Sequence, residues 1–186
     1  RHMEIFLEIV VVINSLLVWG ILLEFPEESF TLARFTGNLT ISFRVDGMTM
    51  VFAGLVSALW PFATLYAFEY MTREERERSF FAFYTMTYGV TLGIALAGNM
   101  LTMYFFYELL TLVTVPLVMH TLSREAILAS RTYLYYSLGG AAFAFISLIF
   151  LTIYGSTTDF ILGGALDLER VGDRTKTLLL VYVMAF

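Results

Sequence analysis

The sequence places one carboxyl side chain, Glu108, in the middle of a long apolar run. The run spans residues 99–119, and Glu108 is the only acidic or basic residue in it. Such a run is typical of a membrane-spanning helix, where an ionised carboxylate costs at least about 3 kcal/mol unless it is paired or protonated. Because acids inside the membrane usually serve transport, we interpret Glu108 as a group that binds and releases protons.

Two hydroxyl side chains share the helical face of Glu108. Tyr104 lies four residues before it and Thr111 three residues after it, so both stack along one side of a helix. Hydroxyls can donate hydrogen bonds to a carboxylate and can relay protons. The alternative is a protonated Glu108 that only holds a neighbouring helix by a hydrogen bond.

Two further side chains could take part in proton transfer. Arg131 lies shortly inside the next apolar segment, where it either extends back to the membrane surface or acts as a charge partner for Glu108. His120 ends the Glu108 run, and it either passes protons at the surface or satisfies free helix carbonyls. The second role is favoured for His120.

The composition indicates an integral membrane protein. Hydrophobic residues make up 59% of the 186 residues and charged residues 15%, with a mean hydropathy of +0.77. The basic residues flank polar breaks and form no exposed basic face, which argues against a nucleic acid partner. No cysteine, phosphate-binding loop or cluster of metal ligands is present, so we expect neither a cofactor nor a metal site in this chain.

The apolar segments predict an all-α, polytopic transmembrane helical bundle that forms one domain over residues 1–186. Polar breaks divide the chain into about six membrane segments, the last of them truncated: 3–23, 47–71, 79–97, 99–119, 127–154, and one that begins near residue 177. Residues 24–45 alternate like a strand and should form an extended element outside the bilayer, with Asp46 as the N-cap of the next helix. Gly89 and Gly93 should let two helices approach closely.

The distribution of basic residues predicts an orientation. Short breaks carry most of the arginines on the side where the chain begins, so that side is predicted to be cytoplasmic. These residues are Arg1, Arg73, Arg76, Arg78, Arg124 and Arg131. Glu4 and Glu8 are expected to stand in water at the same boundary.

Four runs of residues carry a resemblance to a known family. The chain resembles, from about residue 46 to its end, the antiporter-like subunits shared by respiratory complex I, Mrp-type sodium/proton antiporters and membrane-bound hydrogenases. The runs are FRVDGMTMVFAGLVSALWPFATLYAFEYM, REERERSFFAFYTM, LAGNMLTMYFFYELLTLVTVPLVMH and REAILASRTYLYYSLGGAAF. The spacing after PLVMH looks most like the hydrogenase and Mrp branches.

The resemblance implies a role for one residue and a setting for the chain. In that family a glutamate of the ELLTL helix faces a lysine on a later broken helix, and only the glutamate carries over, to Glu108. Arg131 falls where relatives often carry a basic residue. The family's first helix and its lysine-bearing helix are not included, so the chain is expected to be part of a longer or a split subunit. Its partners would be other membrane subunits of the same complex and the lipid bilayer.

Two functions remain open at this point. The first is translocation of H⁺, alone or exchanged for Na⁺, in the cell membrane of a prokaryote, within an oxidoreductase or antiporter complex whose catalysis lies in other subunits. The second is a membrane scaffold that docks a redox arm or neighbouring subunits and transports nothing.

Overall fold

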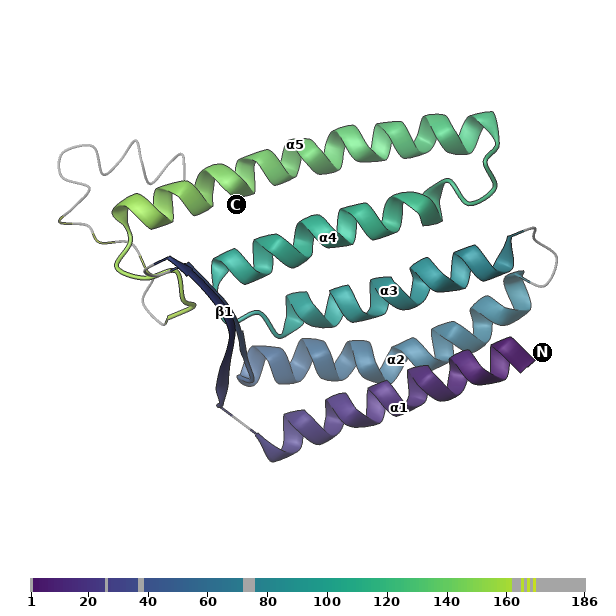
Figure 1. Cartoon of the computed structure of the whole chain (residues 1–186), viewed down its shortest axis with the longest axis horizontal. Helices are drawn as coiled ribbons and strands as arrows, with labels where there is room; N and C mark the ends of the chain where they lie inside the picture. Colours follow the sequence, from purple (N-terminus) through teal and green to yellow (C-terminus); the bar gives the residue numbers. More distant parts are fainter. Residues whose placement is uncertain are drawn as a thin grey trace.

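In the part of the chain that the structure describes, five helices lie side by side in chain order, each antiparallel to the next (Figure 1). A computed structural model describes residues 2–25, 27–36, 39–71, 76–161, 165, 167 and 169. The elements are α1 (His2–Glu24), β1 (Ser29–Thr36), β2 (Leu39–Arg44), α2 (Gly47–Met71), α3 (Glu77–Ala95), α4 (Met100–Val118) and α5 (Arg124–Tyr154). The mostly helical fold predicted from the sequence is confirmed.

Four of the described helices are long and apolar enough to cross a membrane, namely α1, α2, α4 and α5. The six predicted membrane segments are therefore not confirmed, and the sixth lies outside the described residues. The third expected segment, α3, is less apolar because its first turn is charged and its middle carries hydroxyls. Thr85, Thr87 and Thr91 donate to carbonyls of their own helix at 2.8–2.9 Å, so these polar groups are satisfied without water.

The two strands form an antiparallel hairpin at one end of the bundle (Figure 1). This hairpin confirms the extended element expected between the first two helices. Asp46 accepts a hydrogen bond from the Thr49 amide at 2.8 Å, so the predicted N-cap of α2 is also confirmed. The opposite end of the bundle holds the starts of α1, α3 and α5, and Arg76, Arg78 and Arg124 lie there.

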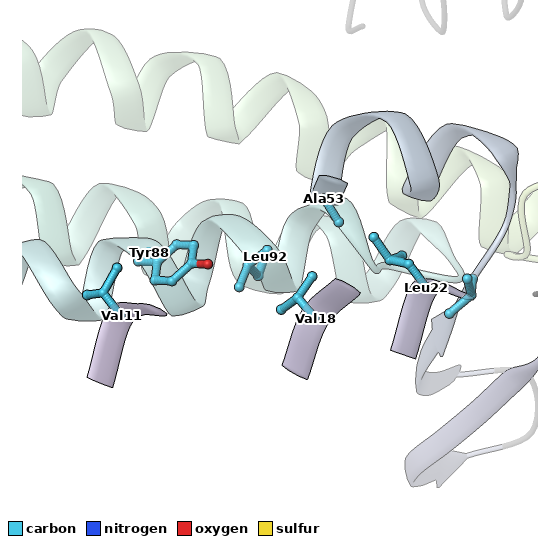
Figure 2. Packing of buried hydrophobic residues seen from close by; sticks show 7 residues of the cluster. Val11, Val18, Leu22, Ala53, Tyr88 and Leu92 are labelled. Carbon is cyan, nitrogen blue, oxygen red and sulfur yellow. The ribbon is translucent and has the colours of Figure 1, made fainter. Parts of the chain in front are cut away.

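The largest apolar cluster joins α1, α2 and α3. Val11, Val18 and Leu22 of α1 lie along a line facing Tyr88 and Leu92 of α3 (Figure 2). Together with Ser15, these α1 residues recur every three to four positions and are almost fully buried, so one stripe of α1 packs against the bundle.

The two glycines predicted to pack helices together differ in their surroundings. A side chain on Gly93 would collide with the Phe106 ring of α4, which confirms a close approach of α3 and α4. Gly89 is exposed, and no atom lies within 4 Å of the position that a Cβ would take. The prediction for Gly89 was wrong because a spacing of four residues also fits a helix face that turns outward.

Candidate functional site

Glu108 lies near the middle of α4. It lies eight positions after Met100 and ten positions before Val118, which corresponds to about 12 Å and about 15 Å along the helix axis. Its side chain is half-buried. A carboxyl group here is about equally far from both ends of its helix.

Tyr104 is the described side chain that interacts with Glu108. The two groups lie one turn apart on α4, and the Tyr104 hydroxyl interacts with the Glu108 carboxyl. The Tyr104 ring packs against Phe145 of α5, with 5.6 Å between the ring centroids. Tyr104 therefore links the carboxyl to the contact between α4 and α5, whereas its spacing predicted only a shared helical face with Glu108.

Hydroxyl pairs continue from Glu108 toward the end of the bundle that holds Arg76, Arg78 and Arg124, which we call the arginine-bearing end. Thr111, which is buried, shares a hydrogen bond of 2.8 Å with Ser137 of α5. One turn further on, Thr114 shares a hydrogen bond of 2.7 Å with the Tyr133 hydroxyl. We call these four residues, Thr111, Ser137, Thr114 and Tyr133, the hydroxyl ladder.

Sequence reasoning missed three members of the ladder. Thr114, Ser137 and Tyr133 were not singled out, although each has a hydroxyl. Tyr133 and Ser137 also lie four residues apart on α5. The spacing was visible within each helix, but the pairing depends on the register between α4 and α5. That register is a tertiary property.

Arg131 does not reach Glu108. It precedes Ser137 by six residues, and Thr111 follows Glu108 by three, so the positions of the two residues on their helices are about 13 Å apart along the bundle. The Arg131 side chain is also exposed. Of the two alternatives for Arg131, this position fits a side chain that extends toward the end of the bundle, and its role as a charge partner of Glu108 stays a prediction.

His120 follows the end of α4 and contacts its last turn. Its Nδ1 lies 3.1 Å from the Leu117 carbonyl oxygen, and its ring meets Phe80 of α3 edge-on. This geometry matches a histidine that satisfies a free helix carbonyl. A role for His120 in proton relay stays a prediction.

Asn99 joins the start of α4 to the hairpin. Its side-chain carbonyl accepts from both the amide and the hydroxyl of Thr102 at 2.8 Å. Its side-chain NH₂ donates to the Thr40 carbonyl and to the Ser42 hydroxyl, each at 2.7 Å. Asn99 is fully buried, so it positions the Glu108 helix relative to the hairpin.

The described part of the chain contains no group of three or more His, Cys, Asp or Glu residues that could hold a metal ion. The candidate site consists of one carboxyl group and several hydroxyls. Such groups can bind, release and pass protons.

Comparisons with known proteins support the resemblance predicted from the sequence. Residues 33–81 match the family model described as NADH-Ubiquinone oxidoreductase (complex I), chain 5 N-terminus. A protein described as a probable K⁺/H⁺ antiporter subunit, from Rhizobium meliloti, is 34% identical over 81 residues, which cover 44% of this chain and 8% of that protein. A Na⁺/H⁺ antiporter subunit from Alkalihalophilus pseudofirmus is 31% identical over 91 residues, which cover 47% of this chain and 11% of that protein.

A solved structure has the same fold. A chain of the membrane-bound sulfane sulfur reductase, an archaeal respiratory membrane complex, matches with a TM-score of 0.75 and 14% sequence identity. The match covers 98% of this chain and 37% of that chain. The sequence therefore corresponds to a small share of the length of each of these proteins, and it resembles antiporter-like subunits of membrane complexes.

Proposed function

We propose that this chain is part of a proton-translocating subunit of a multisubunit membrane complex in a prokaryotic cell membrane, and that Glu108 binds and releases the transported proton. The named relatives are K⁺/H⁺ and Na⁺/H⁺ antiporter subunits, which supports an ion-transport function. For this chain we propose translocation of H⁺ only.

One observation carries the proposal, namely the position of Glu108 among hydroxyl groups. Tyr104 interacts with the carboxyl one turn toward the hairpin, and the hydroxyl ladder begins one turn toward the other end. Each hydroxyl both donates and accepts a hydrogen bond. The Thr114 hydroxyl accepts from Tyr133 while it donates to the Leu110 carbonyl at 2.7 Å, and it can donate to Tyr133 when it turns away from that carbonyl.

The ladder favours one access route to Glu108. Thr111 and Ser137 lie about one turn from the carboxyl, and Thr114 and Tyr133 extend the route toward the end that carries Arg76, Arg78 and Arg124. This end is the predicted cytoplasmic side. Water must join the separate hydroxyl pairs, since the two described bonds lie about one turn apart.

The substitution Glu108→Gln in the whole complex tests this function. Glutamine keeps the shape of the side chain and much of its hydrogen bonding, but it cannot ionise. We expect the complex to assemble while proton pumping falls at least about tenfold, which corresponds to an added barrier of about 1.4 kcal/mol. Reconstituted vesicles with a pH-sensitive dye report the rate.

The matched control is Glu125→Gln, because Glu125 is exposed in the first turn of α5. The control should pump like the parent. If Glu108→Gln also pumps like the parent, Glu108 is a structural link and the scaffold function replaces transport.

A further inference from the structure

A second carboxyl group, Glu8, lies on the packed stripe of α1. It precedes Val11 by three residues, and Val11, Ser15, Val18 and Leu22 continue the same stripe. All four of these residues are buried against α2 or α3. Glu8 is six residues, or about 9 Å, inside the helix, and the expectation that it simply stands in water is not met.

One oxygen of the Glu8 carboxyl is enclosed by protein. Its Oε2 is fully covered and has no hydrogen-bond partner among the described residues. The residue as a whole is only half-buried, so part of the side chain still reaches the surface. A covered carboxylate oxygen without a donor is costly, and binding a proton removes the charge.

Polar groups from α2 and α3 surround this position. Tyr84 of α3 forms a hydrogen bond with the Thr64 hydroxyl of α2 and lies within electrostatic range of the Glu8 carboxyl. One turn further along α3, the Tyr88 hydroxyl shares a hydrogen bond of 2.7 Å with Ser15 of α1. These hydroxyls continue from Glu8 into the bundle along the stripe.

Trp60 of α2 lies against both tyrosines. Its ring centroid is 5.2 Å from that of Tyr84 and 4.9 Å from that of Tyr88. The Trp60 Nε1 group is also buried without a partner in the described part of the chain. The Glu8 oxygen and the Trp60 Nε1 group are both covered without a partner among the described residues, and a water molecule at each would satisfy them.

The charged and titratable groups around Glu8 can be named helix by helix. On α1, Glu4 lies one turn earlier on the same stripe, and on α3 the facing groups are Tyr84 and Tyr88. The buried face of α2 at this level contributes Thr64, Ala67 and Met71, none of which ionises. No described basic side chain forms an ion pair with Glu8, so a proton is the ligand that neutralises it within the described structure.

We propose that Glu8 is a second proton-binding site of this chain, set between α1, α2 and α3 and separate from Glu108. The proton exchanges with the end of the bundle where α1 begins, and the Tyr84 hydroxyl lies within electrostatic range of the carboxyl. This site does not depend on the function proposed for Glu108, because different helices build it.

A hydrophobic carbodiimide tests the proposal in the whole complex. Dicyclohexylcarbodiimide adds to a protonated carboxyl in apolar surroundings and leaves a stable acylurea, which mass spectrometry of peptides locates. We expect Glu8 to be modified at about pH 5 and at least about fivefold less at about pH 9, well above the ordinary pKa of a glutamate. The exposed Glu125 serves as the control and should stay unmodified.

Three results would overturn the proposal. Absence of modification at every pH would mean that Glu8 holds no proton in an apolar site, and equal modification at every pH would mean that the proton does not exchange. Protection by Na⁺ at constant pH would replace the proton by a cation as ligand. The Glu108→Gln complex should show the same pH dependence of Glu8 modification. A negative result at Glu8 therefore leaves the function proposed for Glu108 untouched, and the reverse also holds.

Discussion

At the scale of single residues, hydrogen bonds between hydroxyls determine which groups could pass a proton to Glu108. Tyr133 and Thr114 form the hydrogen-bonded pair of the hydroxyl ladder that lies closest to the predicted cytoplasmic side. Tyr136, three residues further along α5, is 81% exposed. The two tyrosines therefore share a helix but only one of them lies on the proposed route.

We expect Tyr133→Phe to slow proton transport several-fold, because it removes the hydroxyl partner of Thr114, a loss of about 1 kcal/mol. Tyr136→Phe is the matched control and should leave the rate unchanged. Initial rates of dye quenching in reconstituted vesicles would measure both. Equal rates in the two variants would exclude Tyr133 from the route.

The sequence predicted those parts of the site that depend on one helix alone. The contact between Tyr104 and Glu108 follows from a spacing of four residues, and the structure has it. The partner of Thr111 and the distance from Arg131 to Glu108 depend on how α4 and α5 align, which no spacing within one segment encodes. Glu8 was misjudged for the same reason, since its burial is set by α2 and α3.

At the scale of elements, the helix bounds were largely predictable because polar breaks and caps mark them. The second helix was predicted over 47–71, and α2 has the same bounds. The link from Asn99 to the hairpin was not predictable, since it joins residues about sixty positions apart in the sequence. Helix packing was predicted correctly at Gly93 and wrongly at Gly89.

This difference between the glycines gives a paired test. Gly93→Leu should lower the recovery of the assembled complex, because the new side chain meets the Phe106 ring and overpacking costs about 1–3 kcal/mol or more. Gly89→Leu should assemble like the parent, since the space beside Gly89 is open. Yield and melting temperature of the purified complex measure the effect. Normal recovery of the Gly93 variant would contradict the close approach of α3 and α4.

At the scale of the whole molecule, the antiparallel order of the helices places the hairpin and the arginine-bearing turns at opposite ends (Figure 1). The distribution of basic residues predicts that the arginine-bearing end faces the cytoplasm. The proposed access route through the hydroxyl ladder opens at that same end. Orientation and route can therefore be tested together.

Because the chain has no cysteine, single cysteines can report its orientation. We expect Arg78→Cys to react with a membrane-impermeant maleimide from the cytoplasmic side and Ser29→Cys to react from the outside. Both residues lie at the surface, at opposite ends of the bundle. Labelling of this chain in intact cells and in inverted vesicles would compare the two sides, and the reverse pattern would invert the proposed direction of access.

The central claim is that Glu108 gains and loses a proton during turnover, and infrared difference spectroscopy of the whole complex tests it most directly. We predict that a pH jump across the membrane changes the carboxyl C=O bands in the parent, and that Glu108→Gln removes one band of this change while the band proposed for Glu8 remains. Glu8→Gln should retain the Glu108 band. A parent spectrum without any carboxyl change, or an identical change in Glu108→Gln, would contradict the account.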